Sequence, residues 1–148
     1  MFENLADKGI KQRGSPDTLT INIYHPEVIA AKSDLDLAMG GALEITSGYR
    51  DHNVDPAVKN SPHKFAIALD LAAGSLESQI RWGYVAIFNK YFTRCGIYPD
   101  RGIIHLDIAD PEWIKTYNGT RFWVCLGDTY TGFESWIEMI NFARGKND

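Results

Sequence analysis

The sequence has few cysteines, no long apolar run and no block of basic residues, and each absence excludes a class of protein. Its 148 residues contain only Cys95 and Cys125. Two isolated thiols cannot build a disulfide framework or a cysteine-rich zinc site, so we expect both to be small buried residues. The apolar runs are far shorter than the ~20 residues of a membrane-spanning helix, so stable membrane insertion is not expected.

The charge balance argues against nucleic acid as the main partner. The formal net charge is -4 and the pI is about 5.5, with no basic block to offset phosphate charge. The first fourteen residues, MFENLADKGIKQRG, lack the apolar core of a secretory signal, which predicts synthesis in the cytoplasm. With 45% hydrophobic and 23% charged residues, the composition is typical of a globular domain.

The order of apolar patterns predicts an α+β fold. Residues 1–17 are polar and contain breakers at 14–16, so we expect a loose leader before a single domain over 18–148. The expected elements are a strand at 19–24, a helix from Pro26 to Gly40, strands at 43–46 and 65–73, a helix from Ser75 to about Arg94, strands at 103–108 and 121–126, and a helix at 133–143. This order fits a small antiparallel sheet with helices packed on it. In the second helix, the residues expected to face inward are Ile80, Tyr84, Ile87, Phe88, Tyr91 and Phe92.

Two apolar segments carry the side chains with the most chemistry. His63 and Asp70 lie seven positions apart, and His105 and Asp107 lie two apart. One straight strand would hold His63 and Asp70 roughly 20 Å or more apart on opposite faces. The chain must therefore turn or bulge between them, or His63 must lie on a loop that folds back. His105 and Asp107 point the same way from a strand, so one can bind a metal while the other lines the site.

We predict that His63, Asp70 and His105 bind one metal ion, by preference zinc. Three ligands of this type plus a water make up a catalytic zinc site, whereas structural sites are closed by four protein ligands. Each residue also has an ordinary structural interpretation. His63 suits a loop, Asp70 suits a capping position, and His105 suits a core histidine bonded to a backbone carbonyl.

Several short motifs, taken together, resemble one known family. They are Thr46-Ser47-Gly48-Tyr49-Arg50, Asn53, Ser61-Pro62-His63 through Asp70, Gly96-Ile97-Tyr98-Pro99 and Ile103-Ile104-His105-Leu106-Asp107. In order and rough spacing over 45–126, they resemble the zinc D-alanyl-D-alanine peptidase superfamily. The likeness is greatest to its zinc carboxypeptidase branch, found in bacterial cell-wall peptidases and bacteriophage lysins. The resemblance implies the α+β fold shared with the Hedgehog signalling domain.

The resemblance also implies roles for individual residues. His63, Asp70 and His105 correspond to the zinc ligands. Arg50 corresponds to the arginine that holds the carbonyl or carboxylate of the substrate, and Ser61 to the serine two residues before the first ligand. Tyr98 is a candidate donor to the developing oxyanion, with packing at a turn as the alternative.

The chain departs from the family pattern at two positions. Ala66 stands where the family usually has glycine, and Gly102 where several branches have the Glu or Asp that acts as general base. Asp100, two residues earlier, is the preferred candidate for that base, and Asp107 and His52 are lesser ones. Asp107 is alternatively a residue that fixes the tautomer of a ligating imidazole.

The function implied is hydrolysis of peptidoglycan by a zinc metallopeptidase. The substrate would be a stem or cross-bridge peptide, cut by an endopeptidase or a D-Ala-D-Ala carboxypeptidase. Without a secretory signal, the protein would act on the cell wall after release, as a phage or prophage lysin or as a protein carried in a virion. One alternative, favoured by Gly102, is a zinc-containing binding or structural module that has lost catalysis. Another is a metal-free globular domain.

Overall fold

The computed structural model has the α+β architecture that the sequence predicts. It describes residues 3–4, 23–24, 26–47, 68–109 and 120–145. The strands among them are β1 (Glu3–Asn4), β2 (Ile23–Tyr24), β3 (Ile45–Ser47), β4 (Ala68–Ala72), β5 (Arg94–Tyr98), β6 (Ile103–Asp107), β7 (Phe122–Leu126) and β8 (Thr129–Phe133). The helices among them are α1 (Pro26–Met39), α2 (Leu76–Phe88) and α4 (Trp136–Ala143).

Six strands form one open sheet in the order β3-β4-β6-β5-β7-β8. Neighbouring strands are antiparallel except for β5 and β7, which are parallel. The prediction of a wholly antiparallel sheet is therefore wrong at this pair. After β6 the chain returns on the far side of β5, and β7 runs opposite to β6. Because β5 is antiparallel to β6, β7 is parallel to β5. A separate antiparallel pair joins β1 and β2.

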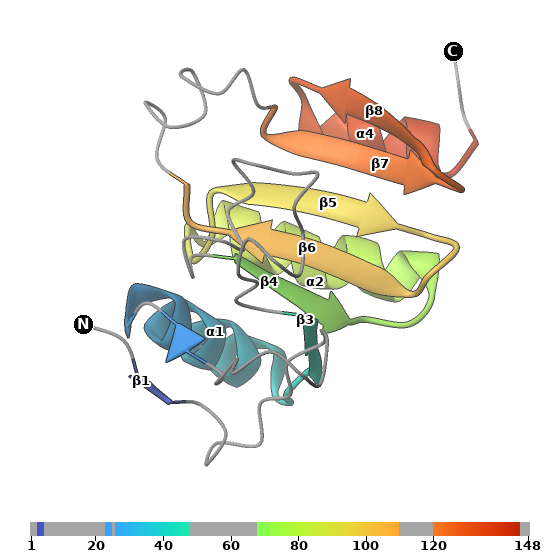
Figure 1. Ribbon diagram of the computed structural model, residues 1–148. Coiled ribbons are helices and arrows are strands. Elements are labelled where there is room, and N and C mark those ends of the chain that lie inside the picture. Colours follow the sequence, from blue (N-terminus) through green and yellow to red (C-terminus); the bar gives the residue numbers. More distant parts are fainter. Residues whose placement is uncertain (1–2, 5–22, 25, 48–67, 110–119, 146–148) are drawn as a thin grey trace.

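The central strands present an apolar face to the helices and a second face away from them. In Figure 1, α2 and α4 lie behind the sheet, and α1 lies beside α2 near the β3 edge. The buried core includes Leu69, Leu71, Ile97, Ile104, Leu106, Phe122 and Val124 from the strands, together with Ile80, Ala86, Ile87, Met139 and Ile140 from α2 and α4. Because side chains alternate along a strand, the residues between these core positions project from the opposite face.

The strand β5 is the main departure from the predicted order of elements. The helix α2 begins as predicted, with the Ser75 hydroxyl accepting a hydrogen bond from the backbone N–H of Ser78 at 3.2 Å. It ends at Phe88 rather than near Arg94, because Lys90 adopts a φ of 61°, outside the helical region. The following residues form β5 instead, because their backbone pairs with β6 on one side and β7 on the other. The strand β8 has no counterpart among the predicted elements.

Two residues predicted to face inward from α2 are instead half exposed. Tyr84 is 50% exposed and Phe88 55%, and their rings stack with centroids 4.5 Å apart. The close approach of α2 to the sheet is at Gly83, where a Cβ atom would lie 2.9 Å from Cys95 Sγ. Tyr84, one position further along the helix, projects about 100° around the helix axis from this contact and packs at the edge of Trp136.

Two other predictions can be compared with the described residues. Cys95 and Cys125 are free and buried, as expected. In the described ranges, none of the helices combines the length and apolarity needed to cross a bilayer.

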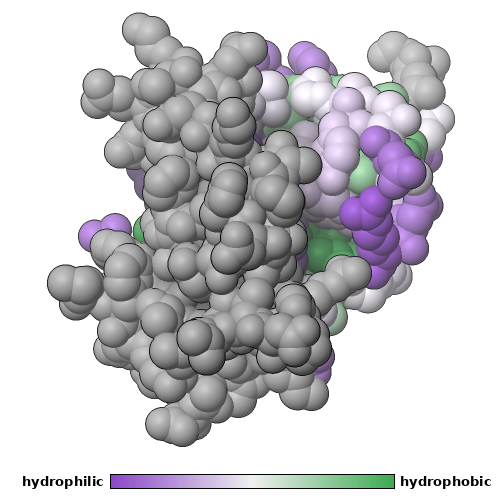
Figure 2. Space-filling view, in the orientation of Figure 1, coloured by the Kyte–Doolittle hydropathy of each residue, from purple (hydrophilic) through white to green (hydrophobic). Residues whose placement is uncertain are grey.

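The space-filling view shows mostly neutral or hydrophilic surface where residues are coloured, with hydrophobic surface in small areas (Figure 2).

A buried glutamine joins α2 to the sheet, and its removal tests this packing. Gln79 is fully buried; its side-chain nitrogen donates to the Gly74 carbonyl at 2.9 Å, and its oxygen accepts from the Tyr98 N–H at 3.1 Å. We expect Gln79→Ala to lower the free energy of unfolding by about 1–3 kcal/mol, because two buried backbone groups lose their partner. Urea unfolding measures the change. Arg81→Ala, at an exposed position of the same helix, is the control, and an equally small loss in both variants would contradict the assignment.

Candidate metal centre

A row of cross-strand neighbours on the face away from α2 and α4 forms the candidate site. Asp70 on β4 is paired with His105 on β6. His105 is paired in turn with Gly96 on β5, and Gly96 with Trp123 on β7. Directly paired residues have Cβ atoms roughly 5 Å apart. The sheet register thus brings together side chains that are distant in the sequence.

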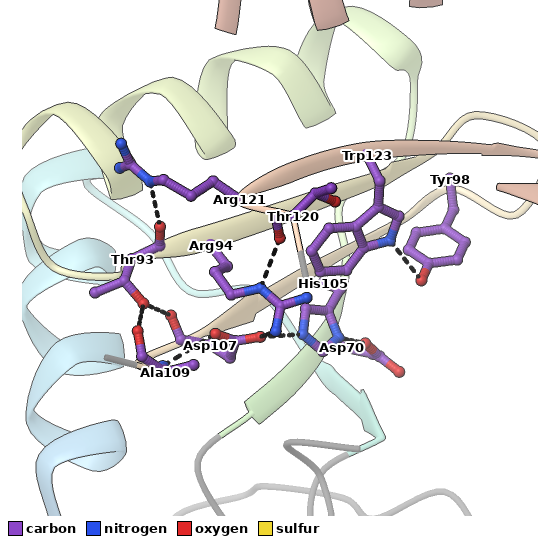
Figure 3. Close-up of polar contacts among 10 residues, drawn as sticks. All are labelled: Asp70, Thr93, Arg94, Tyr98, His105, Asp107, Ala109, Thr120, Arg121 and Trp123. Atoms are coloured by element: carbon purple, nitrogen blue, oxygen red, sulfur yellow. Dashed lines mark hydrogen bonds and ion pairs between the residues drawn. The ribbon is translucent and has the colours of Figure 1, made fainter. Parts of the chain in front are cut away.

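The imidazole of His105 lies between two carboxylates. Its Nδ1 is 3.0 Å from Asp70 Oδ1, and its Nε2 is 2.8 Å from Asp107 Oδ2 (Figure 3). The His105 side chain is 6% exposed, that of Asp107 is fully buried, and that of Asp70 is 19% exposed. The two ring nitrogens therefore face different environments, with Asp70 on the more open side.

The carboxylate of Asp107 is held from three directions. Its Oδ2 faces His105, and its Oδ1 accepts a hydrogen bond from the Ala109 N–H at 3.1 Å. The guanidinium of Arg94 approaches from β5, with Nη1 3.7 Å from Asp107 Oδ2. Arg94 is itself fixed, because its Nε–H donates to the Thr120 carbonyl at 3.0 Å. Asp107 thus has little freedom to leave His105.

The two carboxylates decide the protonation of His105. Burial lowers the pKa of the imidazole, but the hydrogen bonds and negative charges of Asp107 and Asp70 outweigh it and raise the pKa from 6.5 to about 9. In the absence of a metal, the ring at neutral pH is an imidazolium that donates to both carboxylates. Two acidic side chains then face two cations, His105 and Arg94, which is how buried charges are normally compensated.

The structure brings together only some of the predicted site residues. Asp70, His105 and Asp107 converge, and His105 and Asp107 leave β6 on the same face, as predicted. The contacts of His105 to two carboxylates do not match the alternative of a core histidine bonded to a backbone carbonyl. Five other predicted positions lie outside the described residues: Arg50, His52, Ser61, His63 and Ala66.

Tyr98 lies on the same face as His105, and burial raises the pKa of its phenol. The hydroxyl accepts a hydrogen bond from Trp123 Nε1–H at 3.1 Å. Tyr98 therefore lies beside the row, at the end of β5 that leads into the turn.

Asp100, the preferred candidate for the general base, is bound elsewhere. Its Oδ2 accepts a hydrogen bond from the Gly127 N–H at 2.7 Å, which ties the β5–β6 turn to the β7–β8 turn. Within the described residues, this contact directs Asp100 toward the hairpin rather than toward His105. The carboxylate has a structural use where it stands.

Gly102 is required by the turn in which it lies. Its φ is +65°, a conformation that side chains disfavour, and a Cβ atom there would lie 3.3 Å from the Gly74 carbonyl oxygen. Its own carbonyl accepts hydrogen bonds from the backbone N–H groups of Ala73 and Gly74. A Glu or Asp at this position would strain the contact between this turn and the backbone at Ala73 and Gly74, just after β4.

Sequence reasoning did not place Arg94 or Trp123 beside His105, and it named Gly96 only as part of a family motif. Arg94 fell at the end of the predicted helix, so its place opposite Asp107 was not apparent. The signal that could have found Arg94 and Gly96 is the period-two pattern of β5, in which Arg94, Gly96 and Tyr98 share one face.

Known proteins give no further guide to this site. Within the described residues, no group of three His, Cys, Asp or Glu side chains is placed to hold a metal ion. Comparison with protein-family models, curated proteins and solved structures finds no match for the chain. The geometry of the row and the sequence motifs are therefore the basis for a functional assignment.

The pKa of His105 predicts how the stability of the zinc-free protein depends on pH. The folded-state pKa, about 9, is above the ordinary value of 6.5. The stabilisation is therefore fully present below about pH 6.5 and is lost as pH rises through about 9. Urea unfolding with a chelator at about pH 6, 7.5 and 9 should show this loss. His105→Gln is the control, and a constant difference between it and the wild type would contradict the prediction.

Proposed function

We propose that the chain is a zinc-dependent metallopeptidase that hydrolyses peptide bonds of bacterial peptidoglycan. We further propose the fold shared by the zinc D-alanyl-D-alanine peptidases and the Hedgehog domain. The observation that carries the proposal is the convergence of two predicted ligands: His105 Nδ1 and Asp70 Oδ1 lie 3.0 Å apart. The motif match over 45–126 supplies the third ligand, His63.

The donor atoms of Asp70 and His105 fit a zinc ion. Two ligands of a tetrahedral zinc ion, with bonds of about 2.0–2.2 Å, are separated by roughly 3.3 Å. The distance of 3.0 Å between Asp70 Oδ1 and His105 Nδ1, which come from adjacent strands, is close to this separation. Ligating histidines usually donate their second N–H to a carboxylate, and Asp107 stands 2.8 Å from Nε2 of His105. This leaves Nδ1 as the metal-binding nitrogen.

Each residue of the site then has a defined task. Asp70 and His105, with His63, would hold the ion, and Asp107 would fix the His105 tautomer. A zinc ion there would polarise the scissile carbonyl and make a bound water more acidic. Arg50 would hold a carbonyl or carboxylate of the peptide through paired hydrogen bonds, with Ser61 near the first ligand.

The contacts at the candidate positions for the general base favour a second candidate function. Gly102 is required by its turn, Asp100 is bound to Gly127, and both oxygens of Asp107 are engaged. A zinc-containing binding module of the same fold would retain Asp70 and His105 without needing a base. His52 or a released Asp100 would be needed for the peptidase.

Metal analysis and cleavage assays test the proposal. The wild-type protein should bind about one zinc ion per chain and release new amine termini from peptidoglycan. His63→Ala, Asp70→Ala and His105→Ala should lose zinc and activity together, because each removes a ligand. His25→Ala, a histidine outside the motifs, should retain both.

The outcomes separate the candidate functions. Zinc bound by the wild type without cleavage, alongside binding to peptidoglycan, would favour the binding module. Absence of zinc from protein supplied with the metal would reject both zinc functions and leave a metal-free domain. Mass analysis of fragments from defined stem peptides would identify the bond that is cut.

The predicted role of Arg50 has its own test. We expect Arg50→Ala to bind zinc normally but to lower turnover by about 10²-fold, because the peptide loses its alignment. Arg50→Lys should not restore the wild-type rate, since a lysine cannot form two parallel hydrogen bonds. Full activity of Arg50→Ala would contradict the assigned role.

A further inference from the structure

We propose that Trp123 is a positioning residue, held over Gly96 by Arg94 and Tyr98, which fixes the ring orientation of His105. The part of this inference that concerns zinc rests on the proposed function. The part that concerns the imidazole does not, because it follows from contacts of the protein alone.

The absence of a side chain at Gly96 creates the space that the indole occupies. Gly96 lies in β5 between His105 and Trp123 in the paired row. A Cβ atom on Gly96 would lie 2.3 Å from Trp123 Cε2 and Nε1, far inside contact distance. The indole therefore covers β5 at this point and reaches the next strand. Its ring lies 5.0 Å from that of His105, at an interplanar angle of 51°.

The indole is held at its edge and on its face. Its Nε1–H donates to the Tyr98 hydroxyl at 3.1 Å, which prevents rotation of the ring. The guanidinium of Arg94 lies over the ring, with Cζ 4.8 Å from the centroid. Arg94 also approaches Asp107, with Nη1 3.7 Å from Oδ2. The Arg94 guanidinium thus contacts both the Trp123 indole beside His105 and the Asp107 carboxylate that holds His105 Nε2.

These contacts leave His105 little room to turn. Its two nitrogens face Asp70 and Asp107, and the indole of Trp123, itself only 9% exposed, bounds one side of the ring (Figure 3). Hydrogen bonds alone fix the ends of the imidazole. Packing against a neighbouring side chain, here the Trp123 indole, is needed to restrict tilting of the imidazole about the line between the two carboxylates. Residues that support a ligand in this way commonly alter metal affinity by 10- to 100-fold.

The experiment compares variants at position 123 with a matched loss of an indole elsewhere. Trp123→Ala removes the wall, and Trp123→Leu keeps apolar volume without a planar ring, in case the alanine variant does not fold. Gly96→Ala displaces the indole while retaining it. Trp136→Phe is the control, because Trp136 lies in the core between α4 and the sheet.

Two measurements give independent readouts. In zinc-free protein, NMR should show both ring N–H protons of His105 in the wild type and in Trp136→Phe. In the position-123 and Gly96 variants, we expect these signals to broaden or to be lost through exchange. With zinc, competition against a chromophoric chelator should show affinity 10- to 100-fold weaker in the same variants.

The outcomes distinguish this inference from the proposed function. A wild type that binds no zinc would overturn the proposed function, and the ring N–H signals would still decide the role of Trp123. If the folded Trp123 and Gly96 variants gave the same His105 ring signals as the wild type, the positioning role of Trp123 would be overturned. If the wild type binds zinc, variants with the same zinc affinity as the wild type would also overturn it.

Discussion

The placement of one imidazole between two carboxylates is the constraint on which the outer face of the sheet depends. His105 lies within hydrogen-bond distance of Asp70 on one side and Asp107 on the other. A neutral imidazole has a single N–H and cannot donate to both, so a proton or a metal ion must lie on the side of the second nitrogen. Arg94 supplies a further positive charge beside Asp107. Burial makes this compensation necessary, since an unpaired charge there would be costly.

The register of the sheet serves the core and the site at the same time. Leu69 and Leu71 are buried in the core, and Asp70 between them faces His105. A slip of one residue between β4 and β6 would turn the leucines out and the carboxylate into the core. Hydrophobic burial therefore selects the pairing that also brings Asp70 to His105. The parallel pairing of β5 with β7 extends the same row to Trp123.

Features encoded over short distances could be predicted from the sequence. These include α1, the Ser75 cap and the shared face of His105 and Asp107. The strand β5 could not, because its pairing with β6 and β7 is decided by contacts between distant segments. For the same reason Arg94 and Trp123 were not expected beside His105. The zinc ion, the peptidase activity and the role of His63 stay predictions.

Formal charge indicates what kind of ligand this site would suit. With a neutral imidazole, the described residues around His105 carry two negative charges, on Asp70 and Asp107, and one positive charge, on Arg94. A divalent ion bound there, as proposed, would change the local sum from one negative to one positive charge. A site of this sign stabilises negative charge that develops on a substrate oxygen, and it also attracts a ligand that is already anionic. The local charge therefore suits a hydrolase and a binding module equally. The two differ in the general base, which the hydrolase needs as a proton acceptor and the binding module does not.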